Sequence, residues 1–215
     1  LLPQVRYDAE ALDALPFLRP TARSWLDGRE LDLEISCYAE GSVYAPGSPV
    51  LTVEGSFGEA LLLETLVLSV LNADSAIASA AARMVLAAAG RPLIEMGSRR
   101  THEQAAVSAA RAAYVAGFST TSNLEAGRRH GIPTAGTSAH AFVLAHASEA
   151  DAFRAQVTSL GPSTTLLVDT YDTDGGIRTA VQVAGTALGA VRLDSGDPHH
   201  RDRRPGRVRR GAARR

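Results

Sequence analysis

The sequence of 215 residues is 45% hydrophobic and 21% charged, which predicts a globular chain of one or two domains with a sizeable core. All 22 basic residues are arginines, which excludes P-loop enzymes, pyridoxal enzymes and class I aldolases, because each needs a lysine. Cys37 is the single cysteine, which excludes disulfide frameworks and cysteine-rich metal sites and predicts a cytoplasmic protein.

The start of the chain carries no sign of a targeting segment. Its first residues, Leu-Leu-Pro-Gln-Val-Arg, lack the basic-then-apolar order of a signal peptide, and we expect no window to reach the apolar length of a membrane span. No initiator methionine is present, so the chain is expected to begin inside a longer protein.

Residues 198–215 form a basic tail with eight arginines and a single acid, Asp202, which leaves the rest of the chain net acidic. Such a tail can contact nucleic acid. We prefer a disordered or out-of-frame tail, because the segment lacks apolar periodicity, and we expect no nucleic-acid partner.

Residues 1–56 are predicted to form part of a β-rich N-terminal domain. Apolar spacing suggests a helix within 4–15 and another at 22–26. Residues 33–38 and 50–54 alternate as strands do, and the segment between them holds two glycines and two prolines. These features predict two antiparallel strands joined by a rigid loop.

Residues 57–89 contain the longest helical pattern of the sequence. Asn72 and Asp74 interrupt its apolar residues, and we expect a break there with a new helix start. The pattern therefore predicts two apolar helices that pack in the core or at a subunit interface.

From residue 92 the sequence alternates between short apolar runs and helical patterns. Strands are expected at 92–96, 117–120, 132–135, 164–168 and 190–193, and helices at 101–115, 122–130, 139–146, 149–160 and 175–188. The fold class predicted for residues 57–197 is α/β, as an incomplete, irregular barrel of the TIM type.

Charged residues follow four of these expected strands. In barrels of alternating strands and helices, the C-terminal strand ends build one shared site. We therefore expect five residues at the strand ends to converge in space: Arg99, His140, Asp169, Arg192 and Asp194.

His140 is the strongest catalytic candidate among the histidines. Gly136 and Thr137 before it supply a turn with free amides, an arrangement suited to phosphate. Asp169 has two equal interpretations: it caps the following turn, or it accepts a hydrogen bond from the His140 imidazole and holds its tautomer.

The arginines of these strand ends suit anionic ligands. An ion pair with Glu95 would neutralise one of the two neighbouring arginines, Arg99 and Arg100. The other arginine would keep its positive charge and be available to the site. Arg192 can clamp a carboxylate with its planar fork, and Asp194 can accept from a pair of sugar hydroxyls.

Four motifs occur in an order and spacing that resemble nicotinate phosphoribosyltransferase: Glu95-Met-Gly-Ser-Arg-Arg-Thr-His-Glu103, Gly136-Thr-Ser-Ala-His-Ala-Phe142, Leu167-Val-Asp-Thr-Tyr171 and Val191-Arg-Leu-Asp-Ser-Gly-Asp197. Each motif is weak alone, but four in order are specific. The strand region from Glu40 to Glu54 also resembles the family's β domain.

The resemblance implies a type II phosphoribosyltransferase that joins nicotinate to phosphoribosyl pyrophosphate, with Mg²⁺ and coupled ATP hydrolysis, as a homodimer. His140 matches the histidine phosphorylated by ATP, and Asp169 matches its supporting carboxylate. Arg99 matches a phosphate-side arginine, Arg192 the residue at the nicotinate carboxylate, and Asp194 the ribose-side carboxylate. Which residues hold the metal stays open.

The resemblance also implies a preference for nicotinate over nicotinamide. Ser122 stands where nicotinamide-using relatives carry an acidic residue, although it could equally be the N-cap of the following helix. Two alternatives remain open. One is a phosphoribosyltransferase for nicotinamide or quinolinate, and the other is a truncated, non-catalytic fragment without the family's remaining barrel strands.

Overall fold

The computed structural model describes residues 5–195, which fall into two compact units with the boundary between Ala135 and Gly136. The expected tail at 198–215 and Asp197 lie outside the described residues, and the predicted domain boundary between residues 56 and 57 stays a prediction.

The first unit begins with two short helices, α1 (Ala9–Asp13) and α2 (Pro20–Leu26). α1 is shorter than the helix expected within 4–15, because the Asp8 side chain accepts a hydrogen bond from the Ala11 amide and starts the helix at Ala9. The strands β1 (Glu34–Cys37) and β2 (Leu51–Glu54) then pair antiparallel, with Glu34 opposite Glu54, which confirms the predicted pair.

The helix α3 (Phe57–Ala88) is continuous, so the expected break at residues 72–74 is wrong. Asn72 is exposed, and a polar side chain on the solvent side costs a helix only a few tenths of a kcal/mol. Ser56 is the N-cap of the helix, since its hydroxyl accepts from the Glu59 amide and donates to the Glu59 carboxylate.

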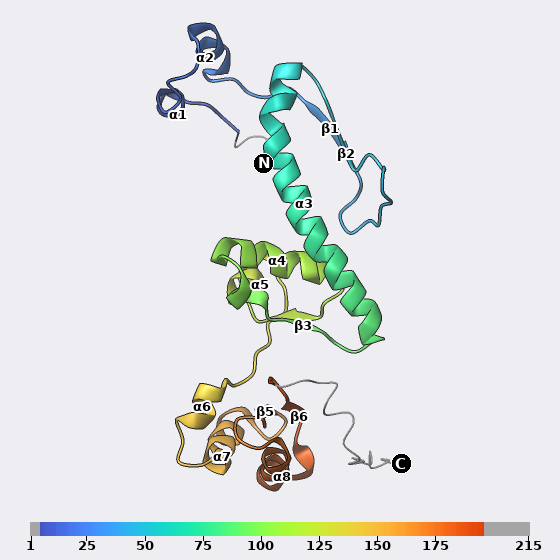
Figure 1. Ribbon diagram of the computed structural model, residues 1–215, viewed down its shortest axis with the longest axis vertical. Coiled ribbons are helices and arrows are strands. Elements are labelled where there is room, and N and C mark those ends of the chain that lie inside the picture. Colours follow the sequence, from blue (N-terminus) through green and yellow to red (C-terminus); the bar gives the residue numbers. More distant parts are fainter. Residues whose placement is uncertain (1–4, 196–215) are drawn as a thin grey trace. The chain divides into compact units, whose positions relative to one another are not determined.

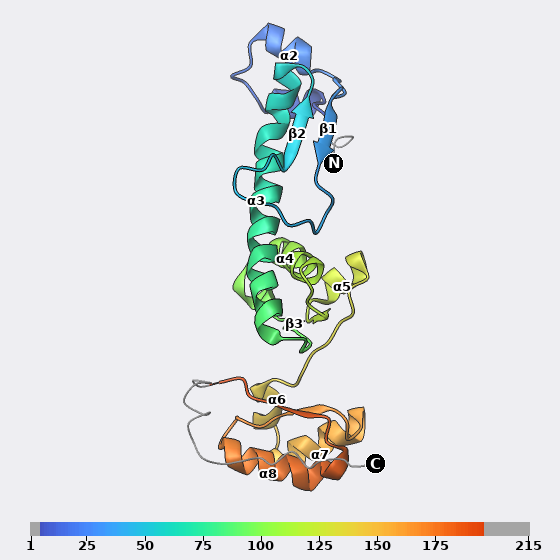
Figure 2. The same cartoon turned by 90° about the vertical axis from the view of Figure 1, so that its right-hand side faces the viewer.

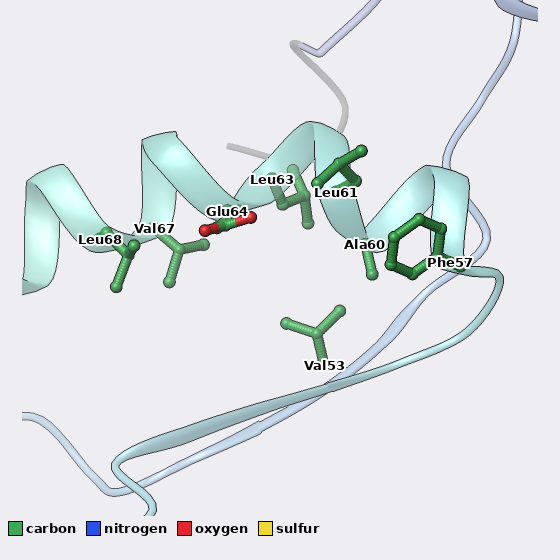
Figure 3. A pocket seen from close by; sticks show the side chains of 8 residues that line it. All are labelled: Val53, Phe57, Ala60, Leu61, Leu63, Glu64, Val67 and Leu68. Carbon is green, nitrogen blue, oxygen red and sulfur yellow. The ribbon is translucent and has the colours of Figure 1, made fainter.

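By length and composition alone, α3 could cross a membrane, because its most apolar 18-residue window has a mean hydropathy of 1.6. The expectation concerned an uninterrupted apolar stretch, and α3 does not contain one of that length, because Glu64 and Asp74 lie within it. In the first unit, α3 contacts α4 and lies beside the β1–β2 pair, as Figures 1 and 2 show. Between β2 and the first turns of α3 lies an apolar pocket (Figure 3), lined by Val53, Phe57, Ala60, Leu61, Leu63, Glu64, Val67 and Leu68.

The rest of the first unit alternates strands and helices. β3 (Ile94–Glu95) leads through the 3₁₀ turn η2 (Gly97–Arg100) to α4 (Glu103–Val115), and β4 (Thr120–Thr121) leads to α5 (Leu124–His130). β3 and β4 pair in parallel, with Glu95 opposite Thr121. The strand expected at 132–135 is reduced to a single parallel bridge between Thr121 and Thr134.

The second unit contains α6 (His140–Leu144), α7 (Glu149–Leu160), β5 (Thr165–Leu167), α8 (Thr173–Ala184), the 3₁₀ turn η3 (Gly185–Ala187) and β6 (Ala190–Arg192). β5 and β6 are parallel neighbours, and α7 and α8 cover one face of the pair (Figures 1 and 2). Their core contains Phe153, Leu166 and Val168. Gly176 permits the close approach of α8, because a Cβ there would lie 2.2 Å from the Val168 carbonyl oxygen.

The mixed α/β class is confirmed. Within residues 5–195 the paired strands form three two-stranded sheets and no closed barrel. The expected antiparallel layer and parallel βα units are present, but the barrel itself stays a prediction.

Candidate functional site

In the second unit, the C-terminal ends of β5 and β6 bring polar side chains together beside the start of α6. Asp169 lies just after β5, Asp194 just after β6, and His140 is the first residue of α6. Because the two strands are parallel, their C-terminal ends lie at one edge, which is where ligands bind in open α/β sheets.

The His140 imidazole has a different environment at each ring nitrogen. Nδ1 lies 3.1 Å from the Thr170 hydroxyl oxygen, within hydrogen-bond distance. Nε2 lies 3.5 Å from Asp194 Oδ2 and 3.9 Å from Asp169 Oδ1, and one third of the side chain is exposed. The ring is therefore anchored at one edge, faces two carboxylates at the other and stays accessible.

Asp169 is the most highly constrained carboxylate of the site. Its Oδ2 accepts from the backbone N–H groups of Asp194 and Ser195, both at 2.7 Å, and from the Ser195 hydroxyl at 2.9 Å. Its Oδ1 is buried without a hydrogen-bond partner among the described residues. Burial by itself would raise the pKa of Asp169, but these hydrogen bonds and the nearby His140 lower it below its ordinary value of 3.8.

Arg192 links three parts of the site. One Nη donates to the Thr137 hydroxyl and lies 3.5 Å from the Ser138 carbonyl oxygen, and the other donates to the Asp194 carboxylate. Its side chain is 20% exposed. The fork is thus oriented by the Thr137 loop and by Asp194, and it leaves further N–H donors for a ligand.

Gly136 and Thr137 have different roles in the loop before α6. Thr137 contributes its hydroxyl to Arg192, a contact that the sequence did not indicate. Gly136 is outside the left-handed region, and a Cβ there would meet nothing within 4 Å, so the backbone conformation does not itself require glycine.

Sequence reasoning missed three residues that hold the site in place. Thr170 contacts His140, Ser195 contacts Asp169, and the buried Gln156 accepts a hydrogen bond from Ser138. Thr170 and Ser195 each directly follow a predicted site carboxylate, and this position in the sequence could have identified them. Gln156 lies in the middle of α7, where no feature of the sequence indicated a role in the site.

Arg99 and Ser122, the remaining predicted site residues, belong to the first unit. Arg99 lies on η2, is exposed and forms no ion pair within residues 5–195. The expected ion pair between Glu95 and Arg99 or Arg100 is wrong. The Glu95 carboxylate instead accepts from the Gly97 amide and from the Thr121 hydroxyl, the latter at 2.7 Å.

Ser122 is not the N-cap of the following helix. Asn123 is the cap, because its side chain accepts from the Ala126 amide at 2.9 Å. The Ser122 amide donates to the Glu95 carbonyl oxygen at 2.8 Å. The capping explanation for Ser122 is therefore wrong, and its hydroxyl forms no hydrogen bond among the described residues.

A metal site made of protein ligands alone is absent from the part of the chain that the structure describes. No group of three or more His, Cys, Asp or Glu side chains is arranged there to hold an ion. Asp169 and Asp194 are two carboxylates at one edge, a set that suits an ion completed by ligand oxygens and water.

No model of a protein family matches the chain. Curated relatives do: nicotinate phosphoribosyltransferase pncB1 of Mycobacterium tuberculosis is 60% identical over 205 residues, which cover 91% of this chain and 46% of the relative. The nicotinate phosphoribosyltransferase of Bacillus subtilis is 41% identical over 74% of this chain and 34% of its own length. The chain thus spans about half the length, or less, of the curated relatives it matches.

Solved structures are similar as well. Human nicotinic acid phosphoribosyltransferase matches 91% of this chain and 51% of its own, with a TM-score of 0.76 and 27% identity. Nicotinate-nucleotide pyrophosphorylase from Pyrococcus furiosus matches 81% of this chain and 44% of its own, with a TM-score of 0.73 and 29% identity. Sequence and structure agree: over about half of its relatives' length, the chain is similar to nicotinate phosphoribosyltransferases.

Proposed function

We propose that the complete protein transfers the phosphoribosyl group of phosphoribosyl pyrophosphate to nicotinate, in NAD biosynthesis. The C–O bond to pyrophosphate breaks, pyrophosphate leaves with the electron pair, and the pyridine nitrogen forms a new bond to the anomeric carbon. The 60% identity to a curated nicotinate phosphoribosyltransferase over 91% of this chain is the observation that carries the proposal. The alternative substrates, nicotinamide and quinolinate, have no comparable support.

His140 is the proposed acceptor of the γ-phosphoryl group of ATP. The carboxylates of Asp169 and Asp194 face Nε2 and favour a proton there, which leaves a lone pair on Nδ1 that accepts from Thr170. In the transfer the Nδ1 lone pair turns from Thr170 to the γ-phosphorus, the P–O bond to ADP breaks, ADP leaves with the electron pair, and a P–N bond forms at Nδ1, while the Nε2 proton stays on the ring facing the carboxylates. The negative charge added at the Nδ1 edge would alter local electrostatics and so couple ATP hydrolysis to substrate binding.

Mg²⁺ fits this edge as an ion shared with substrate phosphates. Asp169 Oδ1 is a buried oxygen without a partner among the described residues, and the Asp194 carboxylate faces the same nitrogen of His140, Nε2. Mg²⁺ is usually bound by one or two carboxylates together with substrate phosphates and waters. When bound, the ion would neutralise charge on the departing pyrophosphate.

The other proposals concern the complete protein. It is expected to be a cytoplasmic homodimer with an irregular TIM-like barrel, to bind ATP, and to have no membrane or nucleic-acid partner. Gly136, Thr137 and Arg99 are proposed to contact substrate phosphates, and Asp194 the ribose hydroxyls.

Arg192 tests the proposed function through the carboxylate of nicotinate. Arg192→Lys removes the planar fork that reaches Thr137 and Asp194 together, so the dissociation constant for nicotinate should rise by about 10- to 100-fold, which corresponds to about 1–3 kcal/mol. Nicotinate mononucleotide formation and nicotinate binding should be measured in the complete protein, with Arg154→Lys, an exposed pair on α7, as the control. Absence of product from wild-type protein would refute the proposed function, and unchanged nicotinate affinity in the variant would refute the role of Arg192.

Ser122 tests base selectivity. An acid at this position would repel the nicotinate carboxylate and accept from the amide of nicotinamide, so Ser122→Asp should lower the preference for nicotinate by at least about tenfold. The two bases should compete in one reaction, with Ser122→Ala as the uncharged control. An unchanged ratio of products in Ser122→Asp would leave selectivity to Arg192 alone.

A further inference from the structure

A buried carboxylate of the first unit is not used by the reaction as proposed. Glu95 ends β3 and is only 8% exposed, yet within residues 5–195 it has no ion-pair partner. A buried charge is costly unless hydrogen bonds compensate for it. The hydrogen bonds that Glu95 forms therefore indicate its structural role.

Both carboxylate oxygens of Glu95 are used by neighbouring turns. Oε1 accepts from the amide of Gly97, the first residue of η2, and Oε2 accepts from the hydroxyl of the fully buried Thr121 at 2.7 Å. Thr121 Oγ1 also accepts from the Asn123 amide at 3.0 Å, and Asn123 Nδ2 donates to Ser98 on η2 at 3.0 Å. These hydrogen bonds link the turn after β3 to the turn after β4, and the peptide bond between Gly97 and Ser98 completes the circuit.

The glycine at position 97 is what allows the carboxylate to approach. A Cβ at Gly97 would lie 2.8 Å from Glu95 Oε1, too close unless the carboxylate moves. The backbone of Glu95 also contributes, because its carbonyl oxygen accepts from the Ser122 amide at 2.8 Å. A single residue therefore contacts the turn that carries Arg99 and the turn that carries Ser122.

We propose that Glu95 is a positioning residue, whose carboxylate, through Gly97 and Thr121, fixes the η2 turn so that Arg99 is presented to the phosphates of the substrate. Hydrogen bonds to a charged acceptor are strong, and a rigid turn presents its guanidinium with less loss of entropy on binding. The substrate part of this inference rests on the proposed function. The fixing of η2 does not.

Amide hydrogen exchange tests the fixing of η2 directly in the complete protein. In Glu95→Ala the Gly97 amide loses its acceptor, so its exchange should become at least about tenfold faster. The Ser122 amide should stay protected, because its acceptor is the backbone carbonyl of residue 95, which the substitution keeps. Glu125→Gln, which loses only exposed ion pairs on α5, should leave both amides unchanged.

Binding of phosphoribosyl pyrophosphate, measured by calorimetry, tests the consequence. Its dissociation constant should rise about tenfold in Glu95→Ala and in Thr121→Val, which keeps the shape but removes the hydroxyl, whereas Thr121→Ser should bind as the wild type does. An unchanged exchange rate of the Gly97 amide in Glu95→Ala would overturn the inference. If the wild type binds phosphoribosyl pyrophosphate, an unchanged dissociation constant in Glu95→Ala and Thr121→Val would overturn it as well. Wild-type protein that binds no phosphoribosyl pyrophosphate would contradict the proposed function, while the exchange result would still decide whether Glu95 holds η2.

Discussion

Replacing His140 by alanine should abolish the transfer of phosphate from ATP to the protein. His140 is the histidine that the structure places beside Asp169 and Asp194, with a third of its side chain accessible. Without a nucleophilic ring nitrogen, no phosphohistidine can form at this edge. Incubation of the complete protein with radiolabelled ATP, followed by mapping of the acid-labile phosphate, measures the effect.

The matched control for this experiment is His146→Ala. His146 lies in the same unit, where its Nδ1 is 2.7 Å from the Phe142 carbonyl oxygen, and no carboxylate faces it at ion-pair distance among the described residues. This variant should keep its label. Full labelling of His140→Ala would show that another residue accepts the phosphoryl group, and the proposed role of His140 would then be lost.

Replacing Asp169 by asparagine should lower both stability and phosphorylation. The carboxylate accepts three hydrogen bonds at Oδ2 and faces His140 with Oδ1, and an amide would place a donor in one of these positions. We expect a loss of about 1.5–3 kcal/mol in the free energy of unfolding at pH 7 and a fall of about 100-fold in the labelling rate. Urea unfolding and the labelling time course measure the two effects.

The pH dependence follows from the lowered pKa of Asp169. Because the folded pKa lies below the ordinary value of 3.8, this group contributes stability that is fully present above that value and is lost as the pH falls through the folded pKa. The stability difference between wild type and Asp169→Asn should therefore shrink as the pH falls below the ordinary value of 3.8.

Asp174→Asn provides the control for Asp169, since Asp174 is an exposed acid in the first turn of α8. It should change the free energy of unfolding by less than about 0.5 kcal/mol. If Asp169→Asn proved as stable and as readily labelled as the wild type, the three hydrogen bonds would have no role in holding His140.

The sequence by itself determined the local elements and the chemistry at their ends. Alternating strands and helices were predictable because apolar periodicity reflects which face of each element is buried. That Asp169 and Asp194 lie close together was predictable because parallel strands place their C-terminal ends at one edge, whereas the roles of these residues and of His140 stay predictions. The continuity of α3 could not be predicted, because Asn72 and Asp74 resemble helix caps unless the neighbouring turns are known to continue.

Only the tertiary structure decided which side chains hold the site residues. The contacts of His140 with Thr170, of Asp169 with Ser195 and of Arg192 with Thr137 join residues that are 30, 26 and 55 positions apart. The sequence likewise suggested an ion pair between Glu95 and a neighbouring arginine. In the folded chain the Glu95 carboxylate accepts hydrogen bonds from Gly97 and Thr121 instead. Charge alone suggests an ion pair, but a buried carboxylate bonds to the donors that strand pairing brings within about 3 Å, and strand register is a property of the folded chain.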